Sequence, residues 1–427
     1  MSIIGYFLYL NYNWQRHNMS TAIQVMKETA TSQHPVDILL LTGGIDRPYV
    51  FGLAMSLLSH DVRLEIIGGD EIDSPEMHTS PHITFINLHG KPRQQLSWVR
   101  KLLKVVRFYV RLFCYTATAR PKIIHVLWNN KVQLFDRSAL MLYYRLIGKR
   151  VVLTVHNVNA GRRDRNDSVL NRLSLKVQYR LAHHIFVHTH KMKCELLEQF
   201  RVCSNAVTVI PFGINDSVPK TELTSEEARQ RLGIERDEKA ILFFGAIRPY
   251  KGVEYLIAAF QALAQKDKGY RLIIVGEPKK GYTHYLLDLQ DTIARDASRS
   301  RIIQRIEFVP DKEIELYFKA ADIAVLPYTL VFQSGVLFLS YSFGLPVIAT
   351  DVGSFCEDII PEKTGYLCLP CDTADLARTI ETYFKSNLYK HLDESRQEIC
   401  DYARKRNSWD VVGKITQDIY AHLLGEN

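Results

Sequence analysis

The feature that most constrains the fold of this chain is an alternation of short apolar runs with helical patterns, which begins near residue 37. The runs DILLLTGG, VRLEIIGGD, KIIHVLW, KRVVLTVH, HIFVHT and AVTVIPFG are rich in β-branched residues, and segments with helical periodicity separate several of them. Continuous β-branched runs joined by helices are typical of a parallel sheet covered on both faces. The pattern therefore predicts a doubly wound α/β domain.

A polar stretch over residues 212–222 interrupts this alternation, which then starts again. Thr224 and Glu227 have the spacing of a helix capping box, and Gly233 is placed to end that helix. The runs KAILFFG, YRLIIVGE, RIEFV, DIAVLP and PVIAT predict a second set of strands, and WDVVGKITQDIYAHLL predicts a last helix.

The length of 427 residues also indicates more than one core, because chains usually split beyond roughly 250–300 residues. We therefore expect two Rossmann-like α/β domains that face each other across a cleft. The expected limits are an N-terminal extension over 1–36, a first domain over 37–215, a second domain over 216–405, and a helix over 406–427 that returns to the first domain.

The composition restricts the partners and the compartment. A formal charge of +8 favours an anionic partner, such as a phosphate ligand, a nucleic acid or an acidic membrane surface. Seven cysteines, no visible secretory signal and no run of about 18 apolar residues predict a reduced, cytoplasmic protein. Cys368 and Cys371 have C-x-x-C spacing without a second pair, so we expect two buried or half-buried thiols.

A candidate anion site begins at the stretch QSGVLFL. Ser334, Gly335 and Val336 follow a predicted strand and open a predicted helix, where free backbone N–H groups and the helix dipole favour an anion. Arg248 and Lys251 lie in another loop between a strand and a helix, at the same edge of the sheet. Two cations beside helix-end amides would stabilise the charge of a departing diphosphate.

Several of these stretches together resemble retaining glycosyltransferases of family 4, which have the GT-B fold. They are FFGAIRPYKGVEYLIAAF, LIIVGE, VIPFGI and ADIAVLPY, followed by QSGVLFLSYSFGLPVIATDVGSFCEDI and KTGYL. The start QSGV resembles a subgroup that lacks the usual paired glutamates; here Val331 and Leu339 stand at those positions. The resemblance implies a nucleotide-diphosphate sugar donor in the second domain, an acceptor in the first, and neither a metal nor a cofactor.

The resemblance also implies roles for individual residues. Lys251 matches the lysine on the donor phosphates, and Arg248 substitutes for an arginine whose usual position here holds Ala246. His156 matches a histidine that approaches the donor sugar, although a strand-end histidine bonded to backbone is the alternative reading. Gly43 and Gly44 match a glycine-rich loop for the acceptor or a phosphate. The donor-binding residues expected are Gly245, Gly276, Glu277, Val309, Gln333, Ser334, Gly335, Val336 and Glu357.

Two further segments allow more than one interpretation. His184, His188 and His190 would share one face of a strand, but no carboxylate or cysteine completes a metal site, so none is predicted. The segment 97–113 is a basic amphipathic helix, which fits either a peripheral membrane contact or an ordinary domain helix with one solvated edge.

The sequence therefore predicts a metal-independent transferase that acts on a glycan or lipid-linked acceptor, in surface polysaccharide or glycolipid assembly at the inner face of the membrane. The missing glutamates leave open a catalytically weak nucleotide-sugar-binding or scaffold subunit. An epimerase of the same fold would need an acidic and histidine set that we do not find. A nucleic-acid partner is not expected, because no interleaved basic and aromatic module is present.

Overall fold

A computed structural model describes residues 36–44, 46–88, 97–164, 166–214 and 218–425. The N-terminal extension that the sequence predicts over residues 1–36 lies, apart from Val36, outside the described residues.

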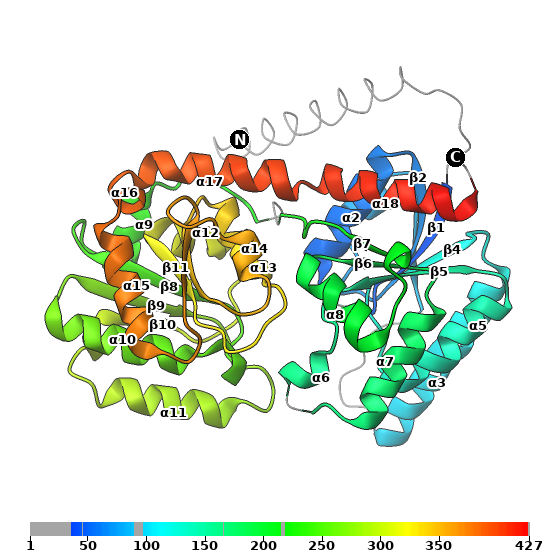
Figure 1. The fold of residues 1–427 in the computed structure, drawn as a ribbon, viewed down its shortest axis with the longest axis horizontal. Coiled ribbons are helices and arrows are strands. Elements are labelled where there is room, and N and C mark those ends of the chain that lie inside the picture. Colours follow the sequence, from blue (N-terminus) through cyan, green and yellow to red (C-terminus); the bar gives the residue numbers. More distant parts are fainter. Residues whose placement is uncertain (1–35, 45, 89–96, 165, 215–217, 426–427) are drawn as a thin grey trace, which may run out of the picture. The chain divides into compact units, whose positions relative to one another are not determined.

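The first domain is built on a sheet of seven parallel strands in the order β3-β2-β1-β4-β5-β6-β7 (Figure 1). The strands are β1 Val36–Leu41, β2 Val62–Gly68, β3 Ile83–Asn87, β4 Ile123–Val126, β5 Arg150–Val155, β6 His184–Val187 and β7 Val207–Val209. Six of them follow the apolar runs of the sequence, whereas the edge strand β3 was not predicted.

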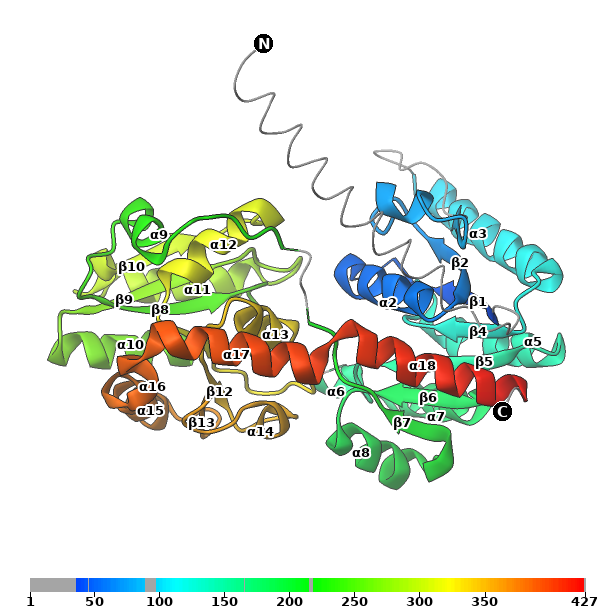
Figure 2. The same ribbon diagram turned by 90° about the horizontal axis from the view of Figure 1, so that it is seen from above.

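Helices cover both faces of this sheet. They are α2 Arg47–Ser59, α3 Trp98–Thr118, α4 Gln133–Phe135, the π-helical turn η2 Asp136–Leu140, α5 Met141–Leu146, α6 Ala160–Arg163, α7 Val169–Leu181 and α8 His190–Phe200. One core joins alternate strand residues such as Leu39 and Leu153 to Leu112 of α3, Tyr144 of α5 and Leu175 of α7. Helix α2 lies on the other side of the sheet (Figure 2).

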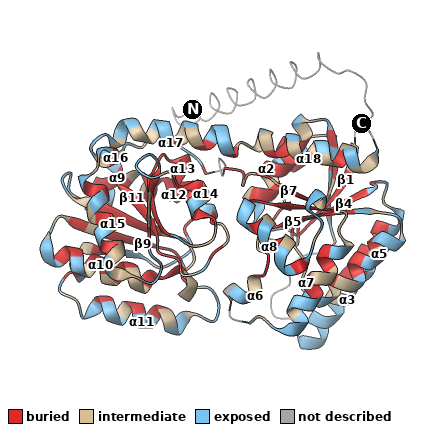
Figure 3. Ribbon diagram, in the orientation of Figure 1, coloured by how far each residue is buried: buried red, intermediate tan, exposed pale blue. Residues whose placement is uncertain are grey.

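The second domain contains six parallel strands in the order β10-β9-β8-β11-β12-β13. The strands are β8 Lys239–Phe244, β9 Tyr270–Val275, β10 Ile302–Arg305, β11 Ile323–Leu326, β12 Val347–Thr350 and β13 Gly365–Cys368. The helices are α9 Ser225–Leu232, α10 Val253–Lys266, α11 Thr283–Ala294, α12 Asp311–Ala320, α13 Gly335–Ser342, α14 Phe355–Asp358, α15 Thr373–Lys385, α16 Asn387–Lys390 and α17 Leu392–Asn407. The strands of both sheets are the most continuously buried elements (Figure 3).

The boundaries of the second domain partly differ from the sequence expectation. The capping box is present: Thr224 and Glu227 exchange hydrogen bonds, and Gly233 ends α9 with φ of 67°. The run RIEFV is not a strand, because the pairing of β10 ends at Arg305, opposite the last residue of β9. The Cys368 thiol is buried as expected, but Cys371 is exposed in a turn with φ of 60°, so that half of the prediction was wrong.

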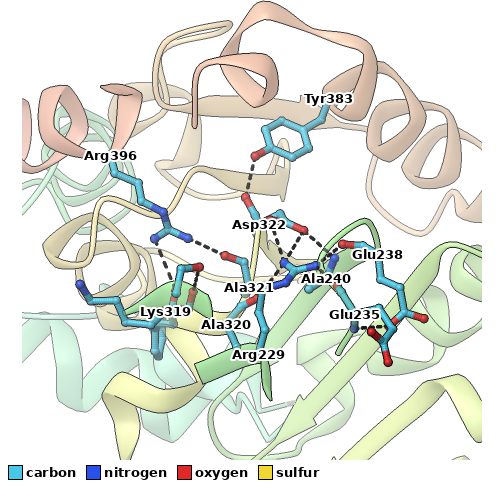
Figure 4. A network of polar contacts seen from close by, with 12 residues as sticks. Arg229, Glu235, Glu238, Ala240, Lys319, Ala320, Ala321, Asp322, Tyr383 and Arg396 are labelled. Carbon is cyan, nitrogen blue, oxygen red and sulfur yellow. Dashed lines mark hydrogen bonds and ion pairs between the residues drawn. The ribbon is translucent and has the colours of Figure 1, made fainter. Parts of the chain in front are cut away.

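An ionic network fixes the amino end of β11 (Figure 4). The candidate anion site follows the carboxyl end of the same strand. Both carboxylate oxygens of Asp322 accept from Arg229 Nη1 at 3.2 Å, and one accepts from the backbone N–H of Ala240 at 2.7 Å. Tyr383 donates to the Asp322 carbonyl, and Arg396 donates to the carbonyl of Ala321. These bonds tie α9, α15 and α17 to the sheet, and we assign the network a structural role.

The last helix, α18 Trp409–Leu424, returns to the first domain as predicted and packs against α2. The Trp409 indole donates to the Ile214 carbonyl at 2.9 Å. Near the other end of the helix, the Tyr420 hydroxyl lies 2.5 Å from Nδ1 of the buried His125 on β4. The molecule therefore has the predicted class: two doubly wound parallel-sheet domains with a returning C-terminal helix.

Candidate functional site

A cavity of about 300 Å³ lies where residues following β1 and β7 meet residues following β8 and β11. It combines polar groups at one helix start with several aromatic and aliphatic side chains. Its lining consists of Asp46, Pro48, Tyr49, Phe212, Gly213, Tyr250, Lys251, Tyr328, Val331, Gln333, Ser334, Gly335, Val336, Leu339 and Trp409. We call it the donor cavity, after the role that the sequence predicted for Lys251 and Ser334–Val336.

The start of α13 presents backbone N–H groups to the donor cavity. Ser334 is the N-cap residue and Gly335 the first residue of the helix. The backbone N–H of Leu337 donates to the Ser334 carbonyl at 3.1 Å, whereas those of Gly335 and Val336 precede the first bond of the helix. A Cβ atom added to Gly335 would contact only a Phe212 ring carbon, at 4.0 Å, which leaves the backbone accessible to a ligand. This geometry favours an anion at the helix start.

Lys251 supplies the cation at the same place. It closes the short helical turn η4, Pro249–Lys251, and only 8% of its surface is exposed. Its Nζ donates to the Tyr328 hydroxyl at 2.8 Å, and the same hydroxyl accepts from the Ser334 hydroxyl at 3.4 Å. Gly245 borders this amine, because a Cβ there would lie 3.1 Å from Lys251 Nζ.

The other predicted donor residues lie elsewhere. The guanidinium of Arg248 lies 5.8 Å from the centre of the Tyr250 ring and is not part of the cavity lining. Gly276 packs against the backbone of Gly245, Glu277 is exposed, and Val309 is buried in the hydrophobic core. Lys251 thus lines the donor cavity together with Gln333, Ser334, Gly335 and Val336, whereas these four residues do not line it.

The wall beside the anion site is largely apolar. Val331 and Leu339 both line the donor cavity, at the positions where the resemblance places two glutamates. Gln333 is the nearby polar exception, and its Oε1 is buried without a hydrogen-bond partner among the described residues. At this wall the cavity therefore offers Gln333 to the hydroxyl groups of a sugar. The carboxylate in the lining is that of Asp46, which caps α2 by accepting from the backbone N–H of Tyr49 at 3.2 Å.

Glu357 joins the two domains. Its two carboxylate oxygens accept from the backbone N–H groups of His190 and Lys191, each at 3.0 Å, at the start of α8. Beside it, the Ser354 hydroxyl donates to the Thr189 hydroxyl at 2.9 Å. Glu357 therefore caps a helix of the first domain and is not among the residues that line the donor cavity.

His156 lies at the carboxyl end of β5 in a cluster of aromatic rings. Its ring stacks on Trp128 with centres 4.1 Å apart, and its Nδ1 lies 3.1 Å from Nε2 of His188. Burial, with His188 next in effect, lowers the pKa of His156 well below its usual range, so the ring is neutral. Its contact with the donor cavity is indirect, through the Tyr49 ring, whose centre is 4.8 Å away.

Gly43 and Gly44 follow β1 with φ of 62° and 73°. A Cβ at Gly43 would lie 2.8 Å from Cβ of Trp128, so the glycine permits the close approach of that tryptophan. A Cβ at Gly44 would meet no atom within 4 Å. This loop therefore supports the aromatic cluster, and Gly44 leaves open space beside the start of α2.

The histidines predicted to share a strand face have different surroundings and do not form one cluster. His184 Nε2 bonds to the Thr208 hydroxyl at 2.9 Å, His188 bonds to His156, and His190 is exposed at the start of α8. Across the described part of the chain, no group of three or more His, Cys, Asp or Glu side chains is arranged to hold a metal ion.

Sequence reasoning missed the aromatic residues of the site. Tyr49, Phe212, Tyr328 and Trp409 come from four distant segments and all line the donor cavity. No short motif relates them, and only the strand order of the two sheets brings them together. A single aromatic residue at a strand end carries no signal by itself, because such residues are common in cores.

Family comparisons agree with this architecture. Residues 224–406 match the family model described as Glycosyl transferases group 1, and residues 42–218 match Glycosyltransferase Family 4. Together the two matches indicate a glycosyltransferase of the family 4 type with the GT-B fold.

Individual relatives are distant. A D-inositol 3-phosphate glycosyltransferase of Corynebacterium aurimucosum is 25% identical over 248 residues, which cover 56% of this chain and 57% of the relative. An uncharacterized glycosyltransferase of Methanocaldococcus jannaschii is 27% identical over 237 residues, covering 54% and 57%. The chain thus aligns with little more than half the length of these relatives.

Solved structures share the fold. Sucrose-phosphate synthase of Thermosynechococcus elongatus has a TM-score of 0.73 at 19% identity, covering 92% of this chain and all of that chain. Anabaena Alr3699/HepE in complex with UDP-glucose has a TM-score of 0.71 at 18% identity, with the same coverage. At these identities the likeness establishes the arrangement of the two domains and no substrate.

Proposed function

We propose that the protein transfers a sugar from a nucleotide-diphosphate sugar to an acceptor hydroxyl with retention of configuration, in the assembly of a surface polysaccharide or glycolipid. The observation that carries this proposal is the meeting of Lys251 with the first turn of α13 in one cavity. A buried ammonium group and helix-start amides form a site for a dianion in low-dielectric surroundings.

The same groups act on the leaving group. As the bond between the anomeric carbon and the diphosphate breaks, negative charge grows on the phosphate oxygens, and Lys251 and the α13 amides stabilise it. The acceptor oxygen then bonds to the same face of the anomeric carbon, and its proton passes to the leaving phosphate. This scheme needs neither a carboxylate at Val331 or Leu339 nor a metal ion or cofactor.

The donor is testable by thermal unfolding with UDP, GDP and ADP, since a nucleotide that binds only the folded state raises its melting temperature. UDP is tested first, because Alr3699/HepE was solved with UDP-glucose and with UDP. We expect Lys251→Ala to weaken binding of the effective nucleotide at least about tenfold, because a charged hydrogen bond to phosphate is lost. Lys280→Ala, on an exposed lysine of the same domain, serves as the control. An undiminished shift in Lys251→Ala would contradict the proposal.

The second candidate function is a catalytically weak nucleotide-sugar-binding or scaffold subunit. The apolar side chains of Val331 and Leu339 in the cavity favour it, because they offer no carboxylate to a sugar. Slow hydrolysis of the matching nucleotide sugar in the absence of acceptor would support the enzyme. Nucleotide binding without hydrolysis, and without transfer to any acceptor offered, would support the scaffold.

We also propose that α3 makes a peripheral contact with an anionic membrane, which would place the enzyme at the inner face of that membrane beside a lipid-linked acceptor. In the described residues no helix is long and apolar enough to cross a bilayer. Helix α3 contains no acidic residue, and the exposed fraction of its Trp98 side chain is 76%. An exposed apolar stripe runs along the helix, and each of its residues is followed directly in the sequence by a basic residue, so that a basic stripe lies beside it. The apolar stripe consists of Val99, Leu103, Val106 and Val110, and the basic stripe of Arg100, Lys104, Arg107 and Arg111.

A further inference from the structure

A second cavity, of about 170 Å³, lies beyond the carboxyl ends of β4 and β5, wholly within the first domain. Its lining includes many polar side chains. The residues that matter for its chemistry are Trp128, Asn129, Gln133, Arg137, His156 and Gln178. We call it the Arg137 cavity.

Arg137 is a buried cation whose hydrogen-bond partners are all neutral. Only 8% of its surface is exposed. Its guanidinium donates to Asn171 Oδ1 at 2.7 Å, to Gln133 Oε1 at 2.9 Å and to the Ser174 hydroxyl at 3.3 Å. Burial lowers the pKa of Arg137, in accord with a charge that lacks full compensation.

The neighbouring carboxyl group does not form an ion pair with Arg137. Asp136 accepts instead from the Tyr109 hydroxyl at 2.8 Å, and burial raises its pKa to about 6. Its charge still acts on Arg137 through space: although burial outweighs this effect, the Asp136 carboxylate raises the pKa of Arg137. A buried guanidinium whose hydrogen-bond partners are all neutral is costly, because proteins usually pair such a group directly with a carboxylate.

Two buried nitrogen atoms of the cavity residues also lack a hydrogen-bond partner among the described residues. They are Nε of Arg137 and Nε2 of His156. The bond to His188 occupies Nδ1 of the neutral His156 ring, which leaves Nε2 for a ligand. Unpartnered buried polar atoms are rare in folded proteins and call for an explanation such as a ligand site.

We propose that the Arg137 cavity binds the phosphate group of a small anionic ligand, with the Arg137 guanidinium as the counter-charge. A planar guanidinium suits phosphate oxygens geometrically, and the Asn129 and Gln178 amides beside it can bond to hydroxyl groups of the same ligand. The site is distinct from the donor cavity, which has its own cation in Lys251.

The ring cluster of Tyr49, Trp128 and His156 connects this site to the reaction. Tyr49 lines the donor cavity, Trp128 and His156 line the Arg137 cavity, and the Tyr49 and Trp128 ring centres are 5.5 Å apart. A ligand anchored by its phosphate at Arg137 therefore lies one ring layer from the donor cavity. On the proposed function, which this step requires, the ligand is a phosphate-bearing acceptor.

The test separates the two anion sites by thermal unfolding with sn-glycerol 3-phosphate and with UDP as probes. We expect the rise in melting temperature caused by glycerol phosphate to persist in Lys251→Ala and to fall at least fivefold in Arg137→Met. The rise caused by UDP should remain in Arg137→Met. Arg180→Met, on an exposed arginine of α7, is the matched control. A glycerol phosphate shift that survives in Arg137→Met overturns the inference, whereas a missing UDP shift in the wild type counts against the proposed donor alone.

The source of the phosphate needs a separate arm, because a lipid headgroup and a free phosphate ester offer the same chemistry. Vesicles of phosphatidylcholine with and without phosphatidic acid replace glycerol phosphate in that arm. If Arg137→Met weakens binding to vesicles with phosphatidic acid but does not change the effect of glycerol phosphate, the ligand is a lipid headgroup. If it changes only the effect of glycerol phosphate, the ligand is a free ester. Independence of Arg137 in both arms contradicts the inference.

A measurement on the unmodified protein covers the case in which Arg137→Met does not fold. Crystals of the wild type soaked in tungstate, a tetrahedral oxyanion like phosphate, would locate bound anions by anomalous scattering. We expect a peak within hydrogen-bond distance of the Arg137 guanidinium. Peaks only at Lys251, or no peak at all, would overturn the inference.

Discussion

Asp358, the last residue of α14, is a buried carboxyl group whose charge depends on pH near neutrality. Burial raises its pKa to about 7, although Arg406 lies 3.4 Å from Oδ1. Its Oδ2 has no hydrogen-bond partner among the described residues. Because the pKa in the unfolded chain is near 3.9, unfolding releases a proton in the window between these values. The stability that the neutral carboxyl contributes is complete below about pH 4 and is lost as the pH rises to about 7.

We predict that Asp358→Asn becomes more stable relative to the wild type as the pH rises from 5 to 8. The amide copies the neutral carboxyl and does not ionise, so the difference should grow by up to about 1.4 kcal/mol per pH unit below pH 7. Urea unfolding at the two pH values measures it, with Asp351→Asn, on an exposed aspartate, as the control. A difference that stays constant over this range would show that Asp358 is already ionised at pH 5.

Single residues also show how far the sequence could predict the site. Lys251, Ser334 and Gly335 were placed correctly in one cavity, because the order of strand, loop and helix fixes the backbone position of each. Arg248 lies in the same loop as Lys251, but the direction of a loop side chain has no periodic signal. The burial of His156 under Trp128 joins residues from two strand ends, which no local pattern reveals.

At the scale of elements, the errors of the sequence analysis fall at the edges of the sheets. Central strands are buried on both faces and therefore appear as continuous apolar runs, which were identified. The edge strands β3 and β13 were missed and β10 was misplaced, because each has a half-buried pattern with polar or small residues. Polar residues on edge strands are expected, because one side of such a strand pairs with no neighbour.

Helix α3 carries the exposed apolar and basic stripes that we propose to contact a membrane. We predict that the double substitution Leu103→Gln and Val106→Gln weakens binding to phosphatidylglycerol vesicles about tenfold or more, because exposed apolar area that would enter the interface is lost. Arg100→Gln with Arg107→Gln should weaken binding to anionic vesicles and leave binding to neutral vesicles unchanged.

Vesicle sedimentation measures both pairs of variants. Leu287→Gln, on an exposed leucine of α11, is the control. Equal sedimentation of the wild type and the Leu103–Val106 variant would show that α3 does not contact the membrane.

At the scale of the whole molecule, α18 fits closely against the first domain. The Trp409 ring packs where Gly52 of α2 and Gly213 have no side chain, and a Cβ at either glycine would overlap the indole. We predict that Gly52→Ala lowers the free energy of unfolding by about 1–3 kcal/mol, because α18 must shift. Urea unfolding measures the loss.

Gly269→Ala is the matched control for this substitution, since a Cβ there would meet only the Asp267 side chain, at 3.2 Å or more. If Gly52→Ala has the same free energy of unfolding as the wild type, α18 does not pack tightly against α2.

The bond between His125 and Tyr420 spans 295 positions of the chain. His125 lies on a central strand of the first sheet, and its partner Tyr420 belongs to α18, which follows the whole second domain in the sequence. The first domain therefore cannot complete its own interior until the second domain and α18 have been synthesised, although its strands emerge early. Until α18 has emerged, the surface of α2 against which it packs stays uncovered. A chain truncated before Trp409 would thus damage the domain farthest from the truncation in sequence.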